Sequence, residues 1–187
     1  RTVQLARSIQ KDFEVECIIL STDQGLDETS KQQYSELKTV ILPCLNDRFY
    51  IPYFSWAKLK ELVEKIDVIH LMSHWSIINA IVYLLARQLD KPYTFCPAGS
   101  LHIFGRSALL KNIYNLFIGK SLIKNASQCI AITNLEKKDF LGFNVQEELI
   151  SVIPNGIDGN EFCPNLEASN AFKNRFGLQR VPYILFM

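Results

Sequence analysis

The sequence lacks several motifs that would indicate a class of protein at once. Its 187 residues contain no C-x-x-C pair, no G-x-G-x-x-G or G-x-x-x-x-G-K-[ST] loop, no G-x-S-x-G elbow and no H-E-x-x-H pair. These absences argue against a zinc site, a dinucleotide or Walker phosphate loop, and the common hydrolase signatures. Hydrolase and metalloenzyme functions therefore lose their support.

Long hydrophobic runs and excess charge are also lacking. The longest apolar stretch, residues 77–86, is interrupted by Asn79, whereas spanning a bilayer takes roughly 20 residues. Twenty Lys and Arg against nineteen Asp and Glu leave a net charge of +1, which predicts no whole-protein attraction to nucleic acid. The five cysteines are odd in number and widely spaced, which is typical of a reducing, cytosolic compartment. Apolar residues make up 48% of the chain, enough for a folded core.

The hydrophobic pattern alternates between strand and helix along the whole chain. Near-continuous apolar runs predict strands at 15–20, 39–42, 67–72, 93–96, 128–132 and 149–153, and helical spacing predicts helices at 2–10, 55–66, 77–89, 107–124 and 134–141. Buried strands separated by helices are typical of a parallel sheet with both faces covered. We therefore predict an α/β fold with a doubly wound, mostly parallel, Rossmann-like sheet.

Both ends of the chain suggest a part of a larger protein. A doubly wound unit normally opens with a strand, but this sequence opens with a helical pattern, so we expect the first strand to be absent. Residues 168–176 predict a helix, and the apolar residues 183–187 predict the first strand of another domain. We place one domain at residues 1–165, and a linker helix with the beginning of a truncated second domain at 166–187.

Polar residues and glycines follow the predicted strands, where open parallel sheets bind their ligands. They are Ser73, His74 and Trp75; Cys96, Ala98, Gly99, Ser100 and His102; Thr133; and Asn155 and Gly156. Imidazole can exchange hydrogen bonds with hydroxyls, and indole can stack on a sugar face, so this edge could recognise a polyol. The alternatives are that both histidines are solvated surface residues, that Trp75 only anchors the next helix, and that residues 154–156 form an ordinary turn.

Residues 91–134 carry five basic side chains and no acidic one. The helix predicted there combines apolar Leu109, Leu110, Ile113, Leu116, Phe117 and Ile123 with basic Arg106, Lys111, Lys120 and Lys124. Such a helix could lie on an anionic membrane surface or meet an anionic acceptor. The pattern favours the simpler interpretation, a sheet-covering helix whose apolar face belongs to the core.

Taken together, four segments resemble a known family. They are D-V-I-H with S-H-W in 67–75, K-P-Y-T-F-C-P-A-G-S-L in 91–101, residues 126–133 with Glu136, and V-I-P-N-G-I-D in 152–158 with Phe162. In order and spacing they resemble the N-terminal lobe of the retaining glycosyltransferases of family 4, which have the GT-B fold. The resemblance implies transfer of a sugar from a nucleotide sugar to an acceptor, with retained anomeric configuration and without a metal or other cofactor. It also implies that the donor-binding residues lie beyond Met187, so that this chain alone is inactive.

The same resemblance assigns roles to residues. Ser73, His74 and Trp75 would line the acceptor side of the cleft, residues 97–101 would face the reacting centre, and Asn155 and Gly156 would lie near the lobe junction. Many members have a histidine directly after the strand at Cys96, and another group has Ser-Pro-Arg-Gly there. This chain has Cys-Pro-Ala-Gly, so Ala98 replaces the arginine and His102 is the substitute to test. The catalytic residues themselves are not assigned.

The expected function is the acceptor-binding half of a hexosyltransferase that acts on a saccharide or lipid-linked acceptor. By its family, we expect it in cell-surface polysaccharide or lipopolysaccharide assembly, cytoplasmic and peripheral at the inner face of a membrane. The alternative is a noncatalytic GT-B-like module that binds carbohydrate. Paired acidic residues and a basic residue in the C-terminal lobe would distinguish the enzyme from the module.

Overall fold

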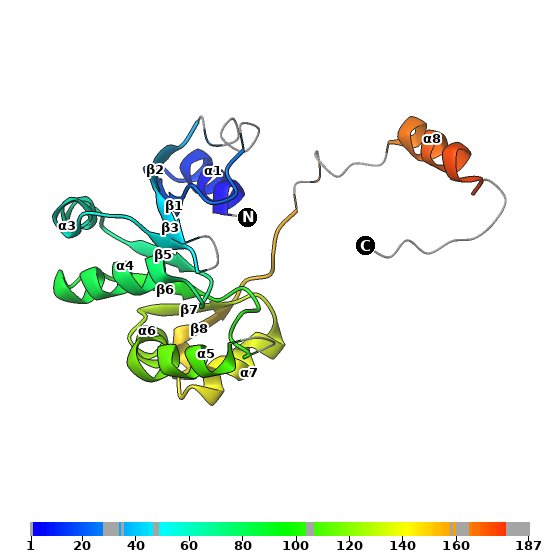
Figure 1. Ribbon diagram of the computed structural model, residues 1–187. Helices are drawn as coiled ribbons and strands as arrows, with labels where there is room; N and C mark the ends of the chain where they lie inside the picture. The colour runs from blue at the N-terminus through cyan, green and yellow to red at the C-terminus, as the bar shows by residue number, and fades with distance from the viewer. Residues whose placement is uncertain are drawn as a thin grey trace. The chain divides into compact units, whose positions relative to one another are not determined.

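The computed structural model describes residues 2–27, 34, 36–46, 49–103, 107–157, 159 and 165–178 (Figure 1). The chain divides into two compact units, Arg1–Pro154 and Asn155–Met187, and each is described by itself. The boundary predicted at residue 165 stays a prediction. Arg106, Phe162 and the strand predicted at 183–187 lie outside the described residues.

The first unit is built around a four-stranded parallel sheet. Its strands, in the order in which they pair, are β5 (Ile69–Met72), β6 (Tyr93–Cys96), β7 (Gln128–Ala131) and β8 (Ile150–Val152). Met72 pairs with Cys96, Phe95 with Cys129, and Ala131 with Val152. This register brings the carboxyl ends of all four strands to one edge, and the predicted α/β fold class is confirmed.

Helices connect these strands and cover one face of the sheet. They are α3 (Trp56–Glu64), α4 (Ile77–Gln88), α5 (Ala108–Tyr114), the π-helical turn η1 (Asn115–Gly119), α6 (Lys120–Lys124), α7 (Asn134–Gly142) and the short 3-10 turn η2 (Glu147–Leu149). Leu85 of α4, Phe95 of β6, Leu122 and Ile123 of α6, and Phe140 of α7 are fully buried in one cluster. Burying these large apolar side chains is the main stabilising contribution to the unit.

The strands alternate in burial more than the sequence predicted. Ile69 and Leu71 face the core, whereas His70 between them is exposed and hydrogen-bonds Thr94 through Nδ1 and Oγ1 at 2.6 Å. The uniformly buried strand predicted at 67–72 is therefore wrong at His70. Its face of the sheet is only partly buried among the described residues, because the core helices pack against the other face.

The N-terminal part forms a smaller layer. Helix α1 (Thr2–Asp12) packs Ala6 against Ile19 and Leu37, beside a parallel pair of β1 (Ile18–Thr22) and β2 (Lys38–Leu42). A short antiparallel pair follows, β3 (Cys44–Asn46) and β4 (Ile51–Pro52). These two strands are not among the predicted ones, because they are too short to show a period.

The second unit contains helix α8 (Leu166–Phe176). The Asn165 side chain accepts a hydrogen bond from the backbone N–H of Ala168, and the helix ends at Gly177 with φ +65°. Both residues are typical caps for a helix start and a helix end. In the part of the chain that the structure describes, no helix is long and apolar enough to cross a membrane.

Candidate functional site

The structure brings most of the predicted residues together at the carboxyl edge of the sheet. The turn after β5 is tied to the turn after β6 by two hydrogen bonds: the N–H of Ser73 donates to the carbonyl of Cys96, and the N–H of His74 donates to Ser100 Oγ, each at 2.9 Å. Thr133 follows β7 at the same edge. Asn155 and Gly156 belong to the second unit, so their predicted place at the junction stays a prediction.

The side chain of Asn79 stabilises the turn after β5. Ser73 has a left-handed backbone, with φ +72°, which a non-glycine residue adopts at a cost of roughly 1 kcal/mol. Asn79 Nδ2 donates to the carbonyls of Met72 and Ser73 at 2.6 and 2.8 Å, and this compensates for the lost strand pairing. Ser76 starts α4 as its N-cap. The Ser73 side chain is left exposed at the edge.

The loop after β6 is tightly folded. Ala98 and Gly99 both have positive φ, +52° and +85°, and Ser100 Oγ donates to the carbonyl of Pro97 at 2.5 Å. Glycine adopts this conformation freely, but alanine is strained there. The chain therefore turns sharply over the end of the sheet, with Cys96 and Pro97 buried beneath and Gly99 exposed above. Burial of the Cys96 side chain places it in the core instead of on the predicted binding surface.

Glu136 joins this loop to the end of β7. Its carboxylate accepts hydrogen bonds from the backbone N–H groups of Gly99 and Ile132, the second at 2.7 Å. Its own N–H donates to Thr133 Oγ1 at 3.1 Å, so Thr133 is the N-cap of α7. Glu136 is 4% exposed, and these hydrogen bonds satisfy its carboxylate where water cannot. Glu136 thereby holds the loop after β6 against the end of β7.

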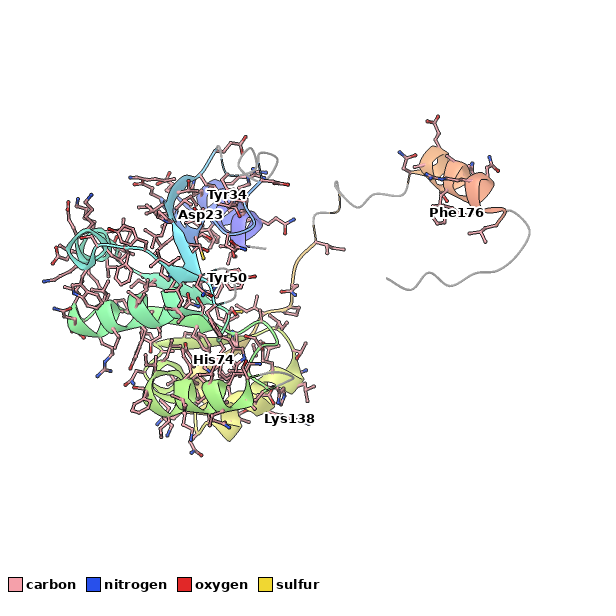
Figure 2. The ribbon with its side chains drawn as sticks, in the orientation of Figure 1. Asp23, Tyr34, Tyr50, His74, Lys138 and Phe176 are labelled. Atoms are coloured by element: carbon pink, nitrogen blue, oxygen red, sulfur yellow. The ribbon has the colours of Figure 1, made fainter. Side chains whose placement is uncertain are left out.

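His74 lies in the interior of the unit. Figure 2 labels His74, whose side chain is fully buried. The rings of Trp75, Phe95, Tyr114 and Phe143 surround it. Nε2 hydrogen-bonds Asn115 Oδ1 at 2.7 Å, across 41 positions of sequence. The side chain thus packs behind Trp75. Because it has no exposed surface, it cannot make the predicted direct contact with an acceptor.

Burial sets the protonation of this cluster. Desolvation lowers the pKa of His74, and the hydrogen bond to Asn115 opposes that shift only in part, so the imidazole is neutral near pH 7. Because an amide oxygen can only accept, Nε2 carries the proton and Nδ1 is a bare acceptor. Nδ1 and the Tyr114 hydroxyl are both buried without a hydrogen-bond partner among the described residues. Burial also raises the pKa of Tyr114 to about 12.

A glycine lets the helix approach His74 this closely. A Cβ on Gly119 would collide with Asn115 Oδ1 and would lie 3.0 Å from His74 Cε1 and Nε2. Gly119 ends the π-helical turn η1, and such turns commonly redirect side chains at functional sites. The turn places Asn115 and Gly119 together against the imidazole. No periodic pattern in the sequence predicts this turn.

Trp75 lies partly exposed at the carboxyl edge of the sheet. Its ring centroid lies 5.6 Å from that of Tyr114, and Lys111 Nζ lies 5.2 Å from the Trp75 ring. His102, in the loop after β6, is about half exposed and pairs with Asp139 of α7, with 3.0 Å between Nε2 and Oδ2. An aromatic face with a nearby cation and several hydroxyl groups can bind a polar, ring-shaped ligand. Among the described residues, no group of three His, Cys, Asp or Glu side chains could hold a metal ion.

The family model for Glycosyltransferase Family 4 matches residues 1–161. The chain belongs to this family. The match confirms the predicted family. Asn79, Tyr114, Asn115 and Glu136 were not among the predicted site residues, although the interruption of an apolar run by Asn79 was a usable signal.

Solved structures show the fold of this family-4 lobe. HepE from Anabaena in complex with UDP-glucose superposes with a TM-score of 0.62 at 16% identity, covering 87% of this chain and 50% of its own. HepE with UDP gives 0.63 at 17% identity, covering 94% and 46%. UDP-GlcNAc 2-epimerase from Neisseria meningitidis bound to UDP-GlcNAc gives 0.55 at 14% identity, covering 96% and 48%.

These likenesses establish the GT-B fold class, and the chain spans about half the length of each of these proteins. No curated protein matches the sequence.

Proposed function

We propose that the protein transfers a hexosyl group from a nucleotide sugar to an acceptor with retention of configuration, and that this lobe binds the acceptor. Membership of Glycosyltransferase Family 4 supports transfer. The observation that carries the acceptor role is the edge formed by Ser73, Trp75 and Ser100, which Glu136 and His74 hold in place from beneath. A binding surface whose backbone is fixed in advance loses little entropy when a ligand binds.

The geometry suggests how the edge would act. Trp75 presents a partly exposed ring to a sugar face, and the exposed Ser73 hydroxyl can accept or donate to a sugar hydroxyl. His102, polarised by Asp139, is positioned to orient the attacking hydroxyl in place of the arginine that Ala98 replaces. These groups position the acceptor, and proximity of that kind can supply several kcal/mol of rate enhancement.

A uridine diphosphate sugar is the donor class that we propose. HepE is described in complex with UDP-glucose and with UDP, and the epimerase is described bound to UDP-GlcNAc. The donor-binding residues would come from a second lobe, because this chain corresponds to half of those structures. The acceptor would be a saccharide or a lipid-linked saccharide in polysaccharide or lipopolysaccharide assembly, at the cytoplasmic side of a membrane.

The first test is nucleotide release by the full-length protein. Incubation with UDP-, GDP- and ADP-sugars, with and without acceptor mixtures, should give acceptor-stimulated release of UDP, and this chain alone should give none. Failure of every donor with folded protein would favour the alternative, a noncatalytic carbohydrate-binding module. Binding of saccharides without nucleotide release would then identify that module.

The sequence offers a matched pair for the acceptor role, because its two tryptophans are Trp56 on α3 and Trp75 at the edge. Trp75→Ala should raise the KM for acceptor at least tenfold and leave donor hydrolysis unchanged. Trp56→Ala should change neither. Equal loss of transfer and hydrolysis in Trp75→Ala would contradict the acceptor assignment.

A further inference from the structure

The hairpin of β3 and β4 carries large apolar and aromatic side chains on its solvent side. Leu45, Phe49, Tyr50 and Tyr53 are all exposed. Pro52 on β4 points the other way and is buried, so one face of the hairpin packs on the protein and the other meets solvent. Apolar and aromatic residues that gather on a surface mark a place where a ligand or partner binds.

The backbone of Tyr50 is strained in a way that packing does not explain. Its φ is +50°, in the left-handed region that glycine adopts freely and that a bulky residue enters rarely. The ring of Tyr50, labelled in Figure 2, is more than half exposed, so the core does not hold it there. Residues kept in such conformations cluster at binding sites. The strain fits a ring that is presented to a ligand.

Hydrogen bonds at both strands fix the hairpin. The N–H of Cys44, at the start of β3, donates to Asp23 Oδ1 at 2.8 Å, and Asp23 directly follows β1. The N–H of Tyr53, directly after β4, donates to the carbonyl of Pro43 at 2.7 Å. The exposed rings therefore stand on a backbone that is ordered in advance, and binding to them loses little entropy.

The hairpin lies at the carboxyl edge of the four-stranded sheet, where the proposed acceptor site is. Three residues join β4 to α3, and α3 ends at the opposite edge, because its Glu64 carbonyl accepts a hydrogen bond from Lys91 Nζ, just before β6. Helix α3 therefore begins at the carboxyl edge. Strand β4 also lies beside α4, which starts directly after the turn that carries Trp75. The rings of the hairpin and of Trp75 thus belong to one edge.

The residue types indicate which ligand the hairpin binds. A tyrosine ring can stack on the C–H face of a sugar, and its hydroxyl can exchange hydrogen bonds with sugar hydroxyls. Tyr50 and Tyr53 offer two such rings, and neither hydroxyl has a partner within the described part of the chain. Trp56, at the start of α3, packs its ring against Phe54 and is not part of this surface.

We propose that Tyr50 and Tyr53 form a second saccharide subsite, so that the acceptor is an oligosaccharide. Trp75 contacts the terminal sugar, which receives the new residue, and the hairpin contacts a sugar further along the chain. This inference rests on the proposed function, because it extends the acceptor site along the same edge. It adds a property that transfer alone does not require, which is recognition of acceptor length.

The test is binding of the full-length protein to arrayed synthetic glycans of one to four sugar units. We expect the tri- and tetrasaccharides of the recognised series to bind about tenfold more tightly than its monosaccharide. Tyr50→Ala with Tyr53→Ala should remove that gain and leave monosaccharide binding unchanged. The matched control is Phe13→Ala, because Phe13 follows α1 and is 66% exposed, against 63% for Tyr53. This control should bind every glycan as the wild type does.

A second variant separates a binding role from a structural one. Tyr50→Gly removes the ring and relieves the strained backbone, so it should weaken oligosaccharide binding without lowering the melting temperature. A residue that served only the fold would show the opposite result. Tyr53→Phe, which keeps the ring, should retain most of the binding.

The outcomes distinguish this inference from the proposed function. Oligosaccharide binding that needs the two tyrosines, in a protein that releases no nucleotide, would support the subsite and contradict the transferase. Acceptor-stimulated nucleotide release in a protein whose glycan binding ignores both tyrosines would overturn the subsite and leave the transferase standing. The subsite would also be overturned if the double variant only converted a self-associated protein to a monomer in analytical ultracentrifugation, because the hairpin would then join two copies.

Discussion

Glu136 accepts a hydrogen bond from the backbone N–H of Gly99, 37 positions earlier in the chain. The bond joins the start of α7 to the loop after β6, and a second bond from Ile132 uses the other carboxylate oxygen. Both donors are backbone groups, so the contact fixes the path of the chain and not only the position of a side chain. The edge is thus shaped before any ligand arrives.

Glu136→Gln should destabilise the first unit by about 1.5–3 kcal/mol, because one of two hydrogen-bond acceptors becomes an amide that faces a backbone donor. Urea unfolding of the full-length protein measures this. Glu148→Gln, at an exposed position in η2, is the control and should leave the free energy of unfolding unchanged. Equal effects of the two changes would show that the Glu136 contacts contribute little.

Gly119→Ala should destabilise the protein by about 1–3 kcal/mol, although alanine is the better helix former. The added Cβ has no space beside Asn115 and His74. Gly142→Ala, in α7, meets nothing within 4 Å and should be neutral or stabilising by up to about 1 kcal/mol. Thermal denaturation of the two variants makes the comparison, and a harmless Gly119→Ala would contradict the close packing.

His74 and Asn115 should be energetically coupled. Changing Asn115 to Leu leaves the Nε2–H donor buried and unpaired, at a cost of about 1–3 kcal/mol, whereas His74→Phe with Asn115→Leu removes both polar groups. The double variant should therefore cost less than the sum of the single changes. A double-mutant cycle by urea unfolding measures the coupling, and additive effects would exclude it.

The stability of the protein should fall as the pH is lowered through about 6.5, the ordinary pKa of histidine. Because burial lowers the pKa of His74 in the folded state, the unfolded state binds the proton more tightly. The contribution of His74 is complete above the unfolded pKa and declines below it, until the pH reaches the folded pKa. Unfolding free energies at pH 7.5 and 5.5 should differ more for the wild type than for His74→Phe.

The sequence predicted the strands of the sheet to within two residues at each end, and β6 without error. Apolar runs between turn residues were sufficient because each strand lies against the helical core. It could not predict that His74 turns inward, since residues in the turn after a strand follow no period. His74 Nε2 donates its hydrogen bond to Asn115 Oδ1, 41 positions away, and pairs of that kind leave no local pattern.

The apolar helix pattern was ambiguous for a related reason. Helical spacing shows that one side of a helix is apolar, but not whether that side meets protein, lipid or water. In the helical segment 108–124 the inward side is chosen by Gly119 and Asn115, whose small and polar side chains a hydrophobicity pattern ignores. Asn115 and Gly119 take core positions beside Leu122 and Ile123, whereas Leu109, Leu116 and Phe117 are exposed.

Gly119 leaves no clearance between the helix and the imidazole of His74, so the segment 108–124 cannot slide along its own axis without a collision. The ring of Trp75 packs against the same imidazole, with 4.4 Å between the ring centroids. A shift of the helix would therefore be transmitted through His74 to Trp75 at the edge of the sheet.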